Sequence, residues 1–189
     1  HPILFMKATS SISGANDPIV RPRNAQQIDW EVELGVVIGS AAKYVSEDKA
    51  LDHVAGYCVV NDLSERYFQM QLTGQWTKGK SCDGFGPVGP YLLTRDEVDD
   101  PQNLDMSVAV NGTMMQNGNS RDMIFSVRQI IAHLSELMTL HPGDIIATGT
   151  PAGVGMGQKP DPRYLQDGDE IVTSIAGLGS QRQIVLAES

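Results

Sequence analysis

Residues Asp29 to Ser40 read Asp-Trp-Glu-Val-Glu-Leu-Gly-Val-Val-Ile-Gly-Ser, with apolar side chains at every second position from Val32 onward. Side chains two residues apart on a β-strand emerge on the same face. The alternation therefore predicts a strand with one apolar face against the core, while Glu31 and Glu33 stand side by side on the opposite face. The apolar face would consist of Val32, Leu34, Val36 and Ile38.

Glu31 and Glu33 allow two interpretations. Neighbouring carboxylates repel each other unless both point into water or a positive charge lies between them. A solvated face of an antiparallel strand is the commoner explanation for an isolated Glu-x-Glu pattern. A hard divalent cation is the alternative, and it gains support where further oxygen ligands converge on the same place. The two glutamates alone leave both interpretations open.

The composition is that of a globular protein of one domain, with 189 residues, 41% apolar and 20% charged. No run is long enough to span a bilayer, and the first residues lack the pattern of a signal peptide. The two cysteines, Cys58 and Cys82, have neither zinc-site spacing nor the density of a disulfide scaffold. We therefore expect a cytoplasmic protein, with Cys58 as a small core residue.

The net charge of −9 argues against two classes of partner. Nucleic acids and anionic membranes are bound through a basic face that displaces counterions. We expect neither as a partner, and an anionic substrate would require a bound metal or a local group of cations to offset the negative background.

A second carboxylate segment follows in the chain. Gly56–Asn61 is typical of a buried strand and leads directly into Asp62. Asp62-Leu-Ser-Glu65 has the form of a capping box, which predicts a helix that begins at Asp62. Helical spacing then places Asp62, Arg66 and Gln69 along one face. An N-cap role explains Asp62 on its own, although its second carboxylate oxygen remains available.

Gly74–Ser81 matches the letters of a phosphate-binding P-loop. That loop functions only where a strand enters it and a helix leaves it. The next residues, Cys-Asp-Gly-Phe-Gly-Pro-Val-Gly-Pro, cannot form a helix, so the nucleotide-binding interpretation is rejected. Lys80 is instead expected in a tight loop, where a lysine is usually a solvated surface group.

Most of the remaining chain predicts strands. Asn111-Gly112 indicates a two-residue hairpin turn between Leu104–Val110 and Thr113–Gln116. One long helix is expected from Val127 to Leu140, after a capping box of Ser126 and Gln129. Shorter elements are expected as strands at Ile3–Met6 and Gln181–Leu186 and as a helix over Glu47–Val54.

Two further segments, Gly143–Thr148 and Gly168–Thr173, share a turn-then-strand pattern, which suggests adjacent antiparallel strands. Between them, Gly149–Gly155 is a glycine-rich loop, interpreted as the wall of a site with exposed backbone N–H groups. The methionines of the hairpin are interpreted as core residues, namely Met106, Met114 and Met115. Many strands with one long helix and a few short ones make the predicted fold class α+β.

Several of these segments together resemble the fumarylacetoacetate hydrolase (FAH) family. The matching blocks cover nearly the whole chain in the right order, and several motifs in sequence are far more specific than any one of them. They are Asp29–Gly39, Gly56–Arg66, Trp76–Pro87 around Lys80, Met123–Ser126, and Gly143–Gly155. The resemblance implies a mixed β-sandwich roll of mostly antiparallel strands.

The resemblance also implies that Glu31, Glu33 and Asp62 hold one Mg²⁺, or Mn²⁺ in its place. A charge argument agrees, because three carboxylates and a divalent ion leave a net charge of −1, whereas the same three without it must protonate or separate. Oxygen-only ligands favour a hard octahedral ion over zinc.

By the same resemblance, Arg66, Gln69, Lys80 and Thr150 line the pocket of a small 2-oxo acid. Cleavage of the C3–C4 bond of a 2,4-dioxo acid generates an enolate, and Lys80 is the catalytic residue expected to stabilise its charge together with the metal. The products would be pyruvate and a second carboxylic acid. Family members are typically homodimers, so a homodimer is expected.

The resemblance also suggests a substrate class and leaves alternative reactions open. The segments Gly155–Pro160 and Gly177–Gln183 are similar to members that act on 2,4-diketo-3-deoxy sugar acids, such as the L-rhamnonate or fuconate derivative. The family also contains oxaloacetate decarboxylases and diene-dioate isomerases with the same metal site. A non-catalytic metal-binding or assembly module is the alternative of another class.

Residues 1–189 are expected to form a single catalytic core that lacks an upstream N-terminal and lid segment. The chain starts at His1-Pro2, without a methionine, as though mid-sequence. In hydrolytic members a His and a Glu on the lid activate the water, and the corresponding motif lies upstream of the block matched by Pro2–Lys7. The general base therefore has no candidate in this chain.

Overall fold

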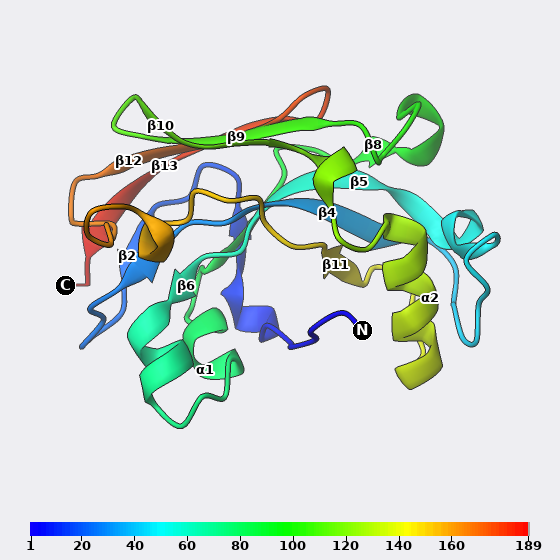
Figure 1. Ribbon diagram of the computed structural model, residues 1–189, viewed down its shortest axis with the longest axis horizontal. Helices are drawn as coiled ribbons and strands as arrows, with labels where there is room; N and C mark the ends of the chain where they lie inside the picture. Colours follow the sequence, from blue (N-terminus) through cyan, green and yellow to red (C-terminus); the bar gives the residue numbers. More distant parts are fainter. Residues whose placement is uncertain (189) are drawn as a thin grey trace.

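The computed structural model describes residues 1–188, and two β-sheets packed on each other form the bulk of the fold (Figure 1). The first sheet has six strands: β1 (Ile12–Gly14), β7 (Gly86–Val88), β5 (Val54–Asn61), β4 (Val32–Ile38) and β11 (Ile145–Ala147) in that order, with β8 (Leu93–Thr94) also paired to β5. The second has five, in the order β10 (Thr113–Asn119), β9 (Asp105–Val110), β12 (Glu170–Ile175), β13 (Gly179–Ala187) and β2 (Ile19–Arg21).

A small third sheet pairs β3 (Ile28–Asp29) with β6 (Ser64–Glu65), and helices are few. The α-helices of the described chain are α1 (Thr77–Lys80) and α2 (Val127–Leu137). Short 3-10 turns occur at Thr9–Ser11, Ala50–His53, Arg95–Glu97, Ser120–Asp122 and Gly155–Gly157, and a π-helical turn at Tyr67–Gln71. Among the described residues, only the β1–β7 and β13–β2 pairs are parallel. The predicted α+β class with mostly antiparallel strands is confirmed.

The stretch that begins at Asp29 forms two strands rather than one, because the chain leaves the ladder at Trp30 and Glu31. β4 lies between β5 and β11 in the first sheet. Its apolar face is fully buried in the core, as predicted. The opposite face is buried too, since Glu31 is only 8% and Glu33 only 4% exposed. The solvated-face interpretation of these two carboxylates is therefore wrong.

The predicted helix at Asp62 is also wrong. After β5 the chain stays extended and pairs as β6 with β3, so that Glu65 lies opposite Ile28. In the predicted capping box the Glu65 carboxylate would accept the main-chain N–H group of Asp62. It accepts the main-chain N–H groups of Gln26, Gln27 and Phe68 instead. Tertiary strand pairing outweighs the local capping preference here, and helical structure begins only at Tyr67.

Lys80 does not lie in a loop, as the sequence suggested, but at the last position of the four-residue helix α1, and it is almost fully buried. Residues 81 to 85 then form a turn that leads into β7. A helix therefore precedes the turn instead of following it, which agrees with the rejection of a nucleotide-binding P-loop.

The hairpin at Asn111-Gly112 is confirmed. It joins β9 and β10, with positive φ angles of 50° at Asn111 and 75° at Gly112, as a type I′ turn requires. β10 continues past the predicted end to Asn119, with a bulge between Met114 and Gln116. Met114 is 58% exposed, so its assignment to the core is wrong.

Other boundaries differ from the expectations as well. Ile3–Met6 forms no strand, and Ile3 is 75% exposed. The expected helix over Glu47–Val54 is reduced to the turn Ala50–His53. The segments from Gly143 and Gly168 are not adjacent strands, since β11 joins the first sheet and β12 the second. β13 confirms the strand predicted at Gln181–Leu186.

Helix α2 has the predicted capping box and ends three residues before the predicted Leu140. The Ser126 side chain accepts from the Gln129 N–H at 3.3 Å, and the Gln129 side chain accepts from the Ser126 N–H at 2.9 Å. Beyond the helix, Leu140 pairs with Ala42 in an isolated β-bridge, which takes the chain out of helical geometry. Among residues 1–188, no helix is long and apolar enough to cross a membrane.

Ser126→Ala is expected to lower the free energy of unfolding by about 1 kcal/mol, because it leaves the first-turn N–H group of Gln129 without its acceptor. Urea denaturation followed by circular dichroism measures this change. Ser180→Ala, at an exposed strand position, serves as the control and is expected to change stability by less than about 0.5 kcal/mol. Equal effects of the two variants would refute the capping contribution.

Candidate metal and substrate site

Three buried carboxylates from separate segments meet at one place. Glu31 comes from the connection between β3 and β4, Glu33 from β4, and Asp62 from the end of β5. One oxygen of each lies within 4.8 Å of the others. The β4–β5 register brings them together, since Val32 is opposite Asn61 and the Asp62 N–H donates to the Glu31 carbonyl at 2.9 Å. The convergence expected of a metal-binding triad is therefore present.

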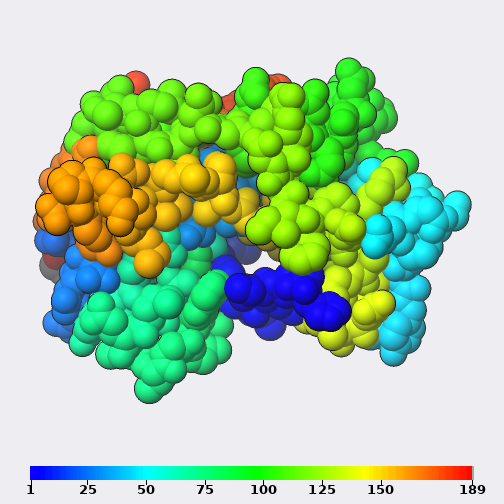
Figure 2. Space-filling view, viewed as in Figure 1, coloured from blue at the N-terminus to red at the C-terminus, as the bar shows by residue number. Residues whose placement is uncertain are grey.

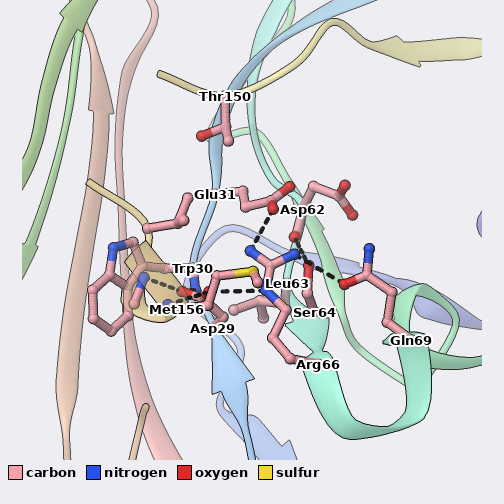
Figure 3. Close-up of polar contacts among 12 residues, drawn as sticks. Asp29, Trp30, Glu31, Asp62, Leu63, Ser64, Arg66, Gln69, Thr150 and Met156 are labelled. Carbon is pink, nitrogen blue, oxygen red and sulfur yellow. Dashed lines mark hydrogen bonds and ion pairs between the residues drawn. The ribbon is translucent and has the colours of Figure 1, made fainter. Parts of the chain in front are cut away.

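Cationic side chains contact two of the three carboxylates. The Lys80 Nζ donates to Glu31 Oε2 at 2.8 Å and to Asp62 Oδ2 at 2.5 Å. Lys7 Nζ donates to Asp62 Oδ1 at 2.6 Å. Arg66 Nη2 donates to Glu31 Oε1 at 2.6 Å (Figure 3). An ammonium group has three N–H donors, so Lys80 keeps one that these two carboxylates do not use.

The charge state of Lys80 follows from its neighbours. Burial disfavours the ammonium form, but Asp62, Glu31 and Glu33 outweigh burial and hold the pKa of Lys80 above its usual value. The Lys80 ammonium also lies 5.0 Å from the centre of the Phe5 ring. Lys80 is therefore a permanent cation and hydrogen-bond donor in this site, and not a base.

Glu33 has a different environment. In the described part of the chain no ion pair reaches its carboxylate, which accepts the N–H of Gly149 at 2.8 Å. Burial, together with the negative charges of Asp62 and Glu31, raises the pKa of Glu33 well above its usual value. Glu33 is thus a buried carboxylate without a direct ion pair, and the nearby charge of Lys80 offsets its burial only in part.

Arg66 and Gln69 lie together, as their spacing predicted. Arg66 Nη1 donates to Gln69 Oε1 at 3.0 Å, while Nε donates to Asp29 Oδ2 at 2.9 Å (Figure 3). Three of the five guanidinium N–H groups are therefore engaged by Asp29, Glu31 and Gln69, and two remain for a ligand. Both side chains are almost fully buried.

Thr150 is beside the triad, but its hydroxyl is directed elsewhere. The Thr150 hydroxyl donates to the Val32 carbonyl at 2.9 Å and accepts from Gln116 Nε2 at 2.8 Å. In Figure 3 it points away from the carboxylates of Glu31 and Asp62. A substrate contact of Thr150 stays a prediction. The preceding Gly149 amide, which was expected to be exposed, is engaged by Glu33.

Three residues that contact the site were not singled out from the sequence, namely Lys7, Asp29 and Gln116. Asp29 precedes Glu31 by two positions, so strand alternation could have identified it. Lys7 and Gln116 carry no such signal, because Lys7 contacts Asp62 across 55 residues of sequence and Gln116 contacts Val32 across 84. Such long-range contacts follow from the sheet topology.

The donor set fits a hard divalent cation. Its candidate ligands, Glu31, Glu33 and Asp62, offer only oxygen, which suits Mg²⁺ or Mn²⁺. The carboxylate of Glu33, which forms no direct ion pair, is the one of the three that a bound cation would stabilise most. If all groups are ionised, four buried carboxylates face three cations, and a divalent ion changes the sum from −1 to +1. The members are Asp29, Glu31, Glu33 and Asp62, with Lys7, Arg66 and Lys80.

The surface near these segments is hollowed. Figure 2 shows a hollow between the N-terminal segment, coloured blue, the segment after β11, coloured yellow to orange, and the segment after β5, coloured teal. Lys7, Gly149 and Asp62 come from these three segments in turn. The polar groups of the site thus come from the segments that border this hollow.

The chain is similar in sequence to known proteins. The chain is 58% identical over 184 residues to the 2,4-didehydro-3-deoxy-L-rhamnonate hydrolase of Sphingomonas sp. SKA58, covering 97% of this chain and 65% of that protein. The chain spans 64–66% of the length of the curated relatives it matches first.

Solved structures have the same fold. The fumarylacetoacetate hydrolase of Exiguobacterium antarcticum superimposes with a TM-score of 0.94 at 45% identity, over 98% of this chain and 66% of that chain. The 2-hydroxyhepta-2,4-diene-1,7-dioate isomerase of Mycobacterium marinum gives 0.91 at 40%, over 100% and 70%. The maleylpyruvate hydrolase of Sphingobium sp. SYK-6, in complex with manganese(II) and pyruvate, gives 0.86 at 37%, over 98% and 64%.

The family profile described as fumarylacetoacetate (FAA) hydrolase C-terminal matches residues 1–186. This match spans both large sheets and all the carboxylates and cations of the site. Together with the close superpositions, it confirms the fold that the sequence motifs implied. The chain belongs to the fumarylacetoacetate hydrolase family.

Proposed function

We propose that this chain supplies the metal site and the cationic pocket of a hydrolase that cleaves a carbon–carbon bond of a 2,4-dioxo acid. The observation that carries the proposal is the buried triad of Glu31, Glu33 and Asp62, in which Glu33 has no direct ion pair and Lys80 lies between the other two. The manganese and pyruvate bound by the maleylpyruvate hydrolase relative are of the same chemical kind as the ligands proposed here.

The proposed substrate is a 2,4-diketo-3-deoxy sugar acid. The L-rhamnonate derivative is the first to test, because a relative 58% identical is named for it, and the fuconate derivative is the second. Water adds to the C4 carbonyl, the C3–C4 bond breaks, and C3 takes up a proton. The products are pyruvate and the carboxylic acid formed from the C4 side, so that one water is consumed for each bond cleaved.

Glu31, Glu33 and Asp62 would hold Mg²⁺ or Mn²⁺, which when bound supplies Lewis-acid polarisation of the 2-oxo group. The side chains of the pocket have their own roles. Lys80, a buried cation with one spare N–H, stabilises the negative charge that develops on the pyruvate enolate. Arg66 has two spare N–H groups with which it orients the substrate carboxylate, and Gln69 adds an amide beside it.

The proposal assigns no water-activating base among the described residues. A homodimer in the cytoplasm stays a prediction from the sequence.

Two alternatives use the same site without an activated water, namely decarboxylation of oxaloacetate and isomerisation of a diene-dioate. The isomerase from Mycobacterium marinum, at 40% identity, supports keeping the second of these in the test. A non-catalytic metal-binding module is the remaining alternative.

The test is a substrate panel with the protein at its natural full length, in Mg²⁺ or Mn²⁺ and after EDTA treatment. We expect release of pyruvate and a second acid from the diketo sugar acid, detected by mass spectrometry, with at least about a hundredfold loss of rate after metal removal. Release of CO₂ from oxaloacetate, or rearrangement without cleavage, would identify the alternative reactions. Cleavage that survives complete metal removal would contradict the proposal.

A further inference from the structure

The Asp29 carboxylate is completely buried and accepts four hydrogen bonds. Its Oδ1 accepts the N–H groups of Trp30 at 2.8 Å and Gly155 at 2.5 Å. Its Oδ2 accepts Arg66 Nε at 2.9 Å and the Met156 N–H at 3.0 Å (Figure 3). Two carboxylate oxygens have about four acceptor positions, so Asp29 has none left for a metal or a substrate. Any role of Asp29 in the site is therefore indirect.

One indirect connection runs through Arg66 to the metal ligand Glu31. The guanidinium is planar and rigid, so fixing Nε against Asp29 also fixes the direction of Nη2. Nη2 donates to Glu31 Oε1 at 2.6 Å, while Lys80 contacts the other oxygen, Glu31 Oε2, at 2.8 Å. The Glu31 carboxylate is thus oriented by Arg66 on one side, and Arg66 is oriented by Asp29.

A second connection runs through residues 149–156 to Glu33. At one end of this segment the Gly149 N–H donates to Glu33 Oε2 at 2.8 Å, and at the other end Gly155 and Met156 donate to Asp29. The approach at Gly155 is close, because a Cβ there would lie 2.8 Å from Asp29 Oδ1 and 2.0 Å from the Arg163 carbonyl. Asp29 therefore anchors the far end of the loop that contacts Glu33.

We propose that Asp29 is a positioning residue, which orients the Glu31 and Glu33 carboxylates for a divalent cation through Arg66 and the loop 149–156. This inference rests on the proposed function, because it requires a cation at the triad. Residues that orient metal ligands without touching the metal typically contribute 10–100-fold to affinity.

Asp29→Asn tests the inference, because the new NH₂ group faces N–H donors that the carboxylate oxygen accepted. We expect the Mn²⁺ dissociation constant, measured by electron paramagnetic resonance or calorimetry, to rise about 10–100-fold. If the unmodified protein does not bind Mn²⁺, the proposed metal site itself is wrong. If it binds Mn²⁺ and Asp29→Asn binds within twofold of it, only the role of Asp29 is wrong.

Glu65→Gln is the matched control, since Glu65 is equally buried and its carboxylate accepts main-chain N–H groups without touching a ligand of the site. We expect a similar loss of thermal stability with a Mn²⁺ dissociation constant within twofold of the unmodified protein. Equal weakening of Mn²⁺ binding in the two variants would indicate general destabilisation and overturn the proposal.

Should Asp29→Asn fail to fold, Arg66→Lys provides the second test. A lysine has one nitrogen and cannot contact Asp29 and Glu31 through separate atoms of a rigid group, as Arg66 does. We expect about a tenfold or larger loss of Mn²⁺ affinity in this variant as well. A folded Arg66→Lys protein with unchanged Mn²⁺ affinity would overturn the proposal.

Discussion

Replacing Glu33 with glutamine is expected to remove measurable Mn²⁺ binding and, in the metal-free protein, to increase stability at neutral pH. Glutamine keeps the size of the side chain but removes a carboxylate that no direct ion pair neutralises and whose pKa burial raises. Removing a proposed metal ligand should have a larger effect than the 10–100-fold loss expected for a residue that only orients a ligand. We therefore expect more than about a hundredfold loss of Mn²⁺ affinity. Calorimetric titration with Mn²⁺ measures this.

The stability effect has a defined pH dependence. Burial first, and then Asp62 and Glu31, raise the pKa of Glu33 in the folded protein above its unfolded value. Below the unfolded pKa, Glu33 is protonated in both states and costs nothing. As pH rises from there to the folded pKa, stability falls because the unfolded state releases this proton while the folded state still holds it. Glu33→Gln lacks this loss, so its advantage in EDTA should be larger at pH 8 than at pH 4.

The comparison isolates Glu33 from its neighbours. Burial would raise the pKa of Asp62, but Lys80 and Lys7 outweigh it and hold that pKa below its usual value, which gives the opposite slope. Asp62 pairs with Lys7 and Lys80 in both proteins, so these ion pairs are common to both. Glu136→Gln, at an exposed position of α2, is the control and should change neither property. Undiminished Mn²⁺ affinity in Glu33→Gln would refute its role as a ligand.

The sequence predicted those parts of the fold that depend on neighbours within a few residues. The capping box at Ser126 and the turn at Asn111-Gly112 were confirmed because their hydrogen bonds and φ angles are local. Strand alternation likewise placed Glu31 and Glu33 on one side of the chain, although Glu31 lies just before β4 begins. Whether that side faces water depends on what packs over it, and the sequence interpretation was wrong on this point.

The sequence predictions were wrong where contacts with a segment distant in sequence determine the local structure. Asp62 has the letters of an N-cap, yet two lysines, 18 and 55 residues away in sequence, bind its carboxylate and β6 pairs with β3. The segments that become β11 and β12 look alike locally but belong to different sheets. The position of Lys7 in the site follows from the same long-range pairing, which alternation or capping patterns do not encode.

Replacing Lys80 with methionine is expected to lower kcat of the full-length enzyme by about 10²–10³, because the enolate loses a preorganised donor. The aliphatic stem is largely preserved, so the variant tests the ammonium. Mn²⁺ affinity should stay equal or improve, since Lys80 no longer competes with the cation for Glu31 and Asp62. KM should change less than kcat if the contact strengthens in the transition state.

Lys78→Met, two residues earlier on α1, is the control for this prediction. Lys78 is exposed, and its ammonium donates to the Leu72 carbonyl and the Thr73 hydroxyl, away from the triad. Its kcat should lie within about twofold of the unmodified enzyme, as expected for a surface position. A Lys80→Met enzyme with unchanged kcat, or one whose loss lies entirely in KM, would mean that Lys80 binds the substrate carboxylate in the ground state and does not stabilise the enolate.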